Sequence, residues 1–299
     1  MSFLSNNKGG NNDFKSFSLT ICLVILSYGF LGSLPLLIEL KYAGTSLDDV
    51  LSIEHMTRII GKNRLLIHLL IPFLFIVGSI WIGVKYFHRR SFKSIITTSD
   101  SFRWNRFFTT FLIWWVVMSL FIYFSYQFSP ELKWNFNWSN FWPLLLISFI
   151  MIPIQTTAEE LFFRGYLAQA FFQKTGSIFH SIILTSILFA CMHAFNPEVT
   201  TLGYGILVYY FMTAVFLAIL SVMDEGLELS MGYHAANNVF TAIIITNNWQ
   251  AFQTDAVFID TSKPSFGLDS IVTLIIIQPL LLLVLSKIYK WKNWKRLVR

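Results

Sequence analysis

The chain has 299 residues, of which 55% are hydrophobic, 17% are aromatic and only 13% are charged. This composition is too apolar for a soluble domain and is typical of a polytopic membrane protein. The net charge of +6 does not indicate a nucleic-acid-binding protein, because the basic residues gather beside apolar segments. We therefore expect the lipid bilayer as a partner and no nucleic acid.

Eight apolar runs are long enough to cross about 30 Å of hydrocarbon, which takes roughly 20 residues each. They predict an all-α fold with about eight transmembrane helices, the seventh of which is short. Residues 1–16 form a polar head in which we see no signal peptide. We expect one membrane domain over 17–289, with its catalytic core at about 141–246, and a basic tail at 290–299. The runs are 17–38, 65–87, 107–128, 141–158, 178–195, 202–223, 231–246 and 270–289.

Basic residues predict the orientation of these helices. Lysines and arginines crowd residues 85–106, between the second and third runs, and return at 287–299. Six helices separate the two clusters, so both face one side of the membrane, which the positive-inside rule assigns to the cytoplasm. Both termini are then cytoplasmic, and the mixed connections at 41–63 and 247–268 become outer loops with room for short interfacial helices.

Three ionisable residues, Glu159, Glu160 and Arg164, directly follow the fourth apolar run in a segment that is otherwise apolar. Charge at such a depth is expensive and commonly functional. On a helix, residues four apart share a face, so Glu160 and Arg164 are expected to pair while Glu159 points elsewhere, toward a polar cavity. A carboxylate in that position suits a general base. The alternative is a salt-bridge cluster that only caps the helix.

The fifth run brings His193 to the level of Glu159. If the fourth helix continues to about residue 173 and the turn spans 174–177, both side chains lie roughly 21–24 Å from the tip of the hairpin at about 1.5 Å per residue. Phe189, four residues before His193, shares its face and restricts the imidazole. A water held between the carboxylate and the imidazole would be a suitable nucleophile for an amide. A satisfied polar residue at a helix end is the simpler alternative.

The seventh run places His234 and Asn238 four residues apart on one helical face. Both can donate hydrogen bonds to the oxyanion that forms when an amide is attacked. Asn237 points elsewhere. The alternative is that His234 and Asn238 only join helices to one another.

The expected depth of His234 in the membrane conflicts with that of Glu159 and His193. His234 lies only about ten residues beyond the end of the sixth run, whereas the hairpin of the fourth and fifth helices reaches deeper or protrudes further. Either the fourth and fifth helices extend into the cytoplasm, or the connection at 224–230 dips into the protein. Pro153 is also positioned to kink the fourth helix.

These three motifs together resemble the CPBP or Abi-type family of membrane-embedded CAAX prenyl endopeptidases. The order is two glutamates, three residues and an arginine, then phenylalanine, three residues and histidine, and finally histidine, three residues and asparagine. The match covers residues 155–240, and the first half of the chain is matched only in hydropathy.

The resemblance implies an eight-helix fold with a conical cavity open to the cytoplasmic side. It implies that Glu159 and His193 activate water, that His234 and Asn238 form the oxyanion site, and that Glu160 and Arg164 support them. No metal or other cofactor is expected to be required. Two histidines and a glutamate could in principle hold zinc, although the chain has no His-Glu-x-x-His motif.

We therefore expect an intramembrane endopeptidase of the CAAX type that acts on a membrane-associated protein or peptide. We expect it in a cell membrane, and the composition of its termini indicates a bacterial source. Bacterial relatives of this kind are linked to bacteriocin immunity. The alternative function is a non-catalytic partner or immunity protein that sequesters a peptide or regulates a membrane sensor. A transporter is disfavoured because no repeat is visible.

Overall fold

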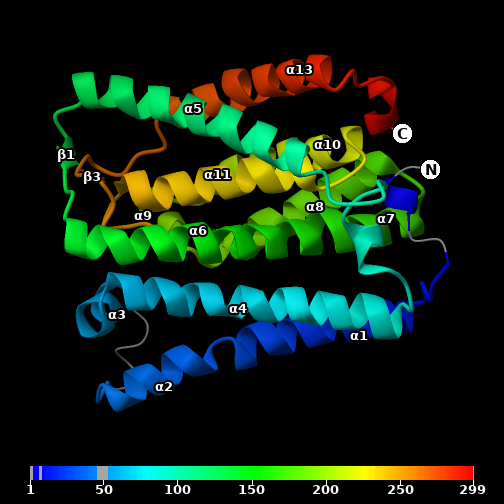
Figure 1. Ribbon diagram of the computed structural model, residues 1–299, viewed down its shortest axis with the longest axis horizontal. Coiled ribbons are helices and arrows are strands. Elements are labelled where there is room, and N and C mark those ends of the chain that lie inside the picture. Colours follow the sequence, from blue (N-terminus) through cyan, green and yellow to red (C-terminus); the bar gives the residue numbers. More distant parts are fainter. Residues whose placement is uncertain (1–2, 7–8, 46–52, 299) are drawn as a thin grey trace.

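The computed structural model describes residues 3–6, 9–45 and 53–298, and these form an almost entirely helical membrane protein (Figure 1). Within those residues, seven helical stretches are long and apolar enough to cross a membrane, which confirms the predicted fold class. The seven stretches are Phe14–Tyr42, Lys62–Phe87, Trp104–Phe128, Trp138–Thr175, Ile178–Phe195, Ile206–Met223 and Ser270–Ile288.

The seventh predicted helix, at 231–246, is α11, Glu228–Ile244, which has 17 residues and lies at the centre of the bundle. It packs between α5, Trp104–Phe128, and α6, Trp138–Glu160. Because α11 is short and buried on nearly all sides, it is not one of the helices able to span the membrane by length and composition, and eight spans are not confirmed. Its short length follows from its position, since its neighbours separate it from lipid.

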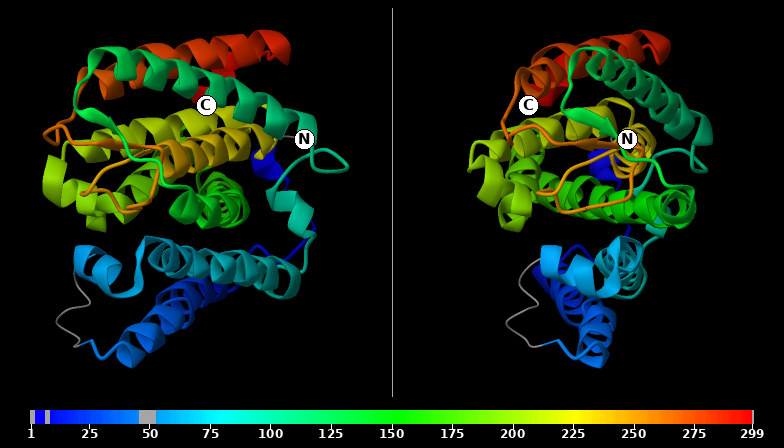
Figure 2. Two further views of the ribbon diagram at one scale, coloured as in Figure 1. Left: turned by 60° about the vertical axis from the view of Figure 1, so that its left-hand side comes forward. Right: turned by 90° about the vertical axis from the view of Figure 1, so that its left-hand side faces the viewer.

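The N-terminal helices form a hairpin on one side of this centre (Figure 2). Its first arm consists of α1, the π-helical η2 and α2, and its second arm of α4 and the π-helical η4, with α3 between the arms. Asp13 begins the first arm by accepting a hydrogen bond from the Ser16 amide at 2.8 Å, as an N-cap does. α4 then packs against α6. The bounds are α1 Phe14–Leu26, η2 Ser27–Leu31, α2 Leu34–Tyr42, α3 Ile53–Ile60, α4 Lys62–Ile82 and η4 Gly83–Phe87.

The hairpin that carries the first two motifs has the predicted turn. α6 continues through the π-helical η6, Leu161–Leu167, into α7, Ala168–Thr175. Gly176 ends α7 in the left-handed conformation with φ 67°, and the Ser177 side chain then caps the N-terminus of α8, Ile178–Met192. Pro153 leaves α6 helical throughout, while the π-helical turn that follows Glu160 was not predicted.

A small sheet forms one end of the molecule. At the end of the bundle remote from both termini, three short strands form a sheet in the order β1-β3-β2, where interfacial helices or loops were expected. β1 pairs antiparallel with β3, and β2 pairs parallel with it. The remaining elements are β1 Leu132–Trp134, η7 His193–Phe195, α9 Pro197–Leu202, α10 Ile206–Met223, β2 Ile245–Thr246, β3 Phe258–Asp260, α12 Leu268–Val272, η8 Thr273–Ile277, α13 Gln278–Ile288, and the short turns η1 Phe3–Ser5, η5 Phe92–Ile95 and η9 Trp294–Val298.

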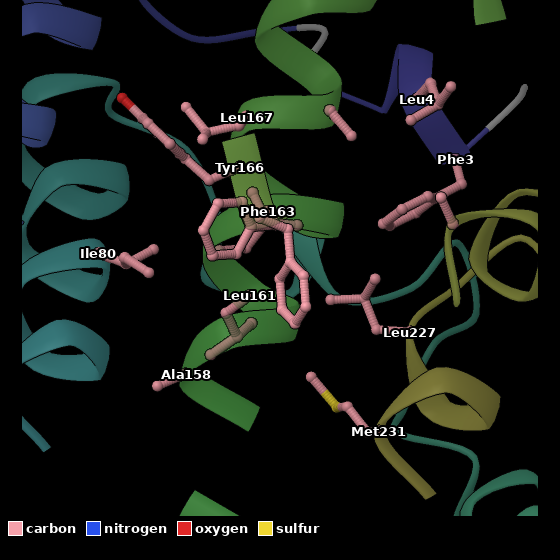
Figure 3. Packing of buried hydrophobic residues seen from close by; sticks show 14 of the residues in the cluster. Phe3, Leu4, Ile80, Ala158, Leu161, Phe163, Tyr166, Leu167, Leu227 and Met231 are labelled. Carbon is pink, nitrogen blue, oxygen red and sulfur yellow. The ribbon is translucent and has the colours of Figure 1, made fainter. Parts of the chain in front are cut away.

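Both termini lie at the same end of the bundle and cover the connection between α10 and α11 (Figure 1). Phe3 and Leu4 belong to the predicted polar head, yet each is only 1% exposed and packs into the main core with Leu227 (Figure 3). The Phe3 amide donates to Glu225, and Arg296 of the tail pairs with the same carboxylate. The first and last residues of the described chain thus hold one turn in place.

The turn before α11 is buried, and this bears on the position of His234 within the protein. Leu227, Glu228 and Ser230 are fully buried, and the Leu227 amide donates to the Ile96 carbonyl, so the connection dips into the protein. The α6–α7 stretch has 38 residues, which at about 1.5 Å each is longer than the roughly 30 Å of hydrocarbon, whereas the stretch Ile178–Phe195 has 18. The buried connection is therefore observed, and the extension of the fourth and fifth helices into the cytoplasm stays a prediction.

Candidate active site

The α6–η6 stretch forms the first wall of the site. Arg164 Nη1 lies 3.0 Å from Glu160 Oε1, and the two side chains are 1% and 0% exposed. The same guanidinium stands 4.3 Å from the ring centre of Phe189 and donates to the Ala214 carbonyl. Charges this deeply buried persist only when paired and hydrogen-bonded. The pair expected from the four-residue spacing is present, and it fixes Glu160 in place.

His234 of α11 lies between the two adjacent glutamates. Its Nδ1 is 2.9 Å from Glu160 Oε1, and its Nε2 is 3.4 Å from Glu159 Oε2. The sequence predicted that Glu159 points elsewhere. The Glu159 side chain does point away from Glu160, but it faces the other ring nitrogen of the same residue, His234. The reason is the packing of α11 against α6, a long-range contact that the local pattern does not contain.

Glu159 is the less constrained of the two carboxylates. Its side chain is 13% exposed, and its Oε2 accepts no hydrogen bond from the described residues. It also interacts electrostatically with His193, although the described residues show no hydrogen bond between them. An intervening water is the usual way to link two such groups. Glu159 Oε2 is thus a buried oxygen that faces His234 Nε2 without a hydrogen bond.

His193 ends α8 with its ring held from three directions. Its Nδ1 donates to the Phe189 carbonyl at 2.8 Å, which leaves Nε2 free to interact with a ligand. Phe189 lies against one side at 4.4 Å between ring centres, and Tyr210 of α10 lies at 4.3 Å. The Phe189 contact follows from the predicted spacing. Tyr210 was missed, since a tyrosine within an apolar run gives no local signal of its role.

Asn238 lies one helical turn from His234 and faces α6. Its amide nitrogen donates to Gln155 Oε1 at 3.1 Å, and its Oδ1 accepts from Asn237 at the same distance. Asn237 also accepts a hydrogen bond from Trp114 of α5. The sequence set Asn237 aside and overlooked Gln155, but the structure connects both to Asn238.

Two cavities differ in size and place. The cavity beside Arg164 has about 10 Å³, room for about one water, and Leu4 of the N-terminal segment lines it. A larger cavity of about 280 Å³ lies along the C-terminal half of α5, next to Trp115 and Phe240. The expected conical cavity open to the cytoplasmic side is therefore not confirmed.

The turn before α11 is charged and tightly held. Arg103 Nε donates to Glu228 Oε1 at 3.0 Å and contacts Asp224 at 3.1 Å. Burial raises the pKa of Asp224 above its ordinary value, while Arg103 and Arg106 oppose that shift. This network anchors the N-terminus of α11 and so sets the position of His234.

Both nitrogens of His234 face carboxylates, Glu160 at Nδ1 and Glu159 at Nε2. Across the described part of the chain, no three His, Cys, Asp or Glu side chains are grouped to bind a metal ion. The arrangement is a hydrogen-bonded set of acids and bases.

Comparison with known proteins agrees with this arrangement. Residues 138–240 match a family model described as type II CAAX prenyl endopeptidase Rce1-like, which confirms the resemblance seen in the motifs. The chain is also 31% identical over 176 residues to the uncharacterized protein YyaK of Bacillus subtilis (strain 168). That alignment covers 58% of this chain and 59% of the relative, so the chain spans about three-fifths of the curated relative it matches. No solved structure matches significantly.

Proposed function

We propose, from the Rce1-like match of residues 138–240, that the protein is an intramembrane endopeptidase. Its substrate would be a peptide bond in a membrane-associated protein or peptide. The proposal stands on His234 between two carboxylates, of which Glu160 is fixed by Arg164, whereas Glu159 faces Nε2 without a hydrogen bond and is 13% exposed. An acid and a base in contact, one of them loosely held, suit proton transfer rather than simple structural support.

The attack on the amide begins with a water between Glu159 and His193. Glu159 accepts a proton from this water, and the water oxygen bonds to the carbonyl carbon. The carbonyl π electrons move to its oxygen, which becomes an oxyanion. His193 Nε2 orients the water, because its Nδ1 is already committed to the Phe189 carbonyl.

Breakdown of this intermediate returns the proton. The oxyanion re-forms the carbonyl, the carbon–nitrogen bond breaks, and the leaving nitrogen takes the proton that Glu159 received. His234 and Asn238 stabilise the oxyanion by donating hydrogen bonds. Glu160 accepts from His234 Nδ1, so Nε2 can donate to the oxyanion only when the imidazole carries a proton on both nitrogens. The products are a new carboxyl terminus and a new amino terminus.

No step requires a metal, which gives the proposal a direct chemical test. Turnover of purified protein in detergent should be unchanged by 1,10-phenanthroline and by dialysis against EDTA. A loss of turnover that zinc restores would contradict the glutamate mechanism and favour a metal site at Glu159 and the two histidines.

The activity itself is tested by comparing membrane peptides from cells that carry the wild-type chain, Glu159→Gln or Glu54→Gln. Glu54 is an exposed glutamate in α3 and serves as the matched control. We expect a precursor to accumulate and its products to vanish with Glu159→Gln alone. If all three strains yield the same peptides while the cellular phenotype persists, the chain acts as a non-catalytic partner or immunity protein.

A further inference from the structure

A row of four side chains crosses from α5 through α11 to α6. Trp114 Nε1 donates to Asn237 Oδ1 at 3.2 Å, Asn237 Nδ2 donates to Asn238 Oδ1 at 3.1 Å, and Asn238 Nδ2 donates to Gln155 Oε1 at 3.1 Å. We call these four residues the amide chain. It connects the far side of α11 to the helix that carries Glu159.

The first member of the amide chain sets the direction of all its hydrogen bonds. An indole N–H can only donate, so the atom of Asn237 that faces Trp114 is its oxygen. The Asn237 nitrogen then faces Asn238, and the same reasoning turns the Asn238 nitrogen toward Gln155. The chain therefore ends on Gln155 Nε2, a donor.

Gln155 ends this chain beside the reacting groups. It lies four residues before Glu159 on the same face of α6, about 6 Å away along the axis. Asn238 lies four residues after His234 on α11, which runs antiparallel to α6. Gln155 with Asn238, and Glu159 with His234, are therefore neighbouring pairs across one helix interface.

Gln155 is only 4% exposed, and its recorded hydrogen bond is the one that Oε1 accepts from Asn238. Its Nε2 is not one of the fully buried atoms of the described chain that lack a hydrogen-bond partner, so this donor keeps some accessible surface and can meet an acceptor when the site is occupied. The carbonyl oxygen of the amide under attack has that chemistry. It is an acceptor without a proton, and its negative charge grows as the water oxygen adds.

We propose that Gln155 is a further catalytic residue, whose Nε2 donates a hydrogen bond to the substrate carbonyl oxygen. This hydrogen bond becomes stronger when the oxygen turns into an oxyanion. The inference rests on the proposed function. Trp114 and Asn237 act as positioning residues, because aligned hydrogen bonds polarise one another and hold the donor in place, while Asn238 keeps its own role at the oxyanion.

Two substitutions at Gln155 separate this role from structural support of Asn238. Gln155→Glu keeps an oxygen for Asn238 and removes the Nε2 donor, whereas Gln155→Leu removes both. With the precursor identified from the membrane peptides as substrate, we expect both variants to lower kcat by about 100-fold with little change in KM. If Gln155→Glu restores wild-type kcat while Gln155→Leu does not, Gln155 only supports Asn238 and the proposal is wrong.

A matched pair of tryptophans tests the rest of the amide chain. Trp114→Phe removes the first donor, while Trp115→Phe changes a neighbour that packs on Phe240 outside the chain. We expect Trp114→Phe to lower kcat by less than about tenfold and Trp115→Phe to leave it unchanged. Equal effects of the two variants would remove the positioning role of Trp114.

Failure of this inference is distinguishable from failure of the proposed function. Wild-type products that depend on Glu159, together with normal kcat in Gln155→Leu and Gln155→Glu, would overturn the role of Gln155 alone. If the wild-type chain yields no product that depends on Glu159, the endopeptidase proposal falls, and the role of Gln155 falls with it.

Discussion

Where α6 meets α11, the facing side chains include charged groups and amides as well as apolar residues, whereas η2 meets α4 through two serines beside apolar residues. The first interface joins Glu160 to Arg164 and His234, and Asn238 to Gln155. In the second, Ser27 and Ser79 share a hydrogen bond of 2.6 Å. Helices in lipid gain little from hydrophobic burial against each other, so close packing of small residues is a sufficient join. The buried charged side chains of α6 and α11 are not needed to hold two helices together, so we infer that they serve a chemical function.

The largest expected effect comes from breaking the buried ion pair. Arg164→Met leaves Glu160 without its cation, and removing one partner of a buried pair costs about 3–5 kcal/mol. We expect a lower unfolding midpoint in detergent and loss of turnover together. Wild-type stability in this variant would show that Glu160 is held by His234 alone.

A pH-dependent contact joins the N-terminal segment to η6. His88 Nδ1 donates to the Asn11 carbonyl, and its Nε2 accepts from Tyr166. Burial, aided by Arg90, lowers the pKa of His88 from 6.5 to about 4. Between these values the unfolded chain binds more protons than the folded one, so stability falls as the pH drops from 6.5 to 4.

Thermal unfolding across this pH window should show a loss of up to roughly 3 kcal/mol from His88. His88→Asn is the control, since it removes the titrating group. A midpoint with the same pH slope in the wild-type protein and in His88→Asn would contradict this assignment.

The small-residue interface is tested by adding a methyl group. A Cβ on Gly32 would lie 2.6 Å from the Pro72 Cα, whereas a Cβ on Gly29, one turn earlier, would meet nothing within 4 Å. We expect Gly32→Ala to lower stability by about 1–3 kcal/mol and Gly29→Ala to be neutral. Equal midpoints would show that the hairpin tolerates separation of its arms.

The smallest expected effect concerns the support of His193. Tyr210→Leu removes one of the two rings beside the imidazole, and we expect a kcat about tenfold lower, equivalent to about 1.4 kcal/mol. Tyr210→Phe keeps the ring and should retain most of the activity. If Tyr210→Phe is as slow as Tyr210→Leu, the hydroxyl rather than the ring is what matters.

Local patterns predicted much of this molecule. Apolar runs located the helices, Gly176 marked the turn between α7 and α8, and the four-residue spacing predicted the Glu160–Arg164 pair. Contacts between distant segments were harder to predict. The approach of Glu159 to His234 and the burial of Phe3 depend on how helices far apart in sequence pack, which no local period records.

Gln155 and Tyr210 illustrate the same limit within the site. Tyr210 stands in an apolar run without a charged neighbour at helical spacing, and nothing in the sequence separates it from a residue that only packs. Gln155 lies four residues before Glu159, but that spacing alone does not show that Asn238 of a distant helix meets it. The structure identifies them by their partners, Asn238 and His193.

The central claim is that the two adjacent glutamates differ in role, Glu159 in chemistry and Glu160 in holding the site together. The most direct test measures turnover and unfolding midpoint on the same preparations of Glu159→Gln and Glu160→Gln. We predict that Glu159→Gln unfolds like the wild-type protein but loses at least about 100-fold in turnover, while Glu160→Gln unfolds at a clearly lower temperature. Turnover retained by Glu159→Gln, or an equal loss of stability in both variants, would contradict the account.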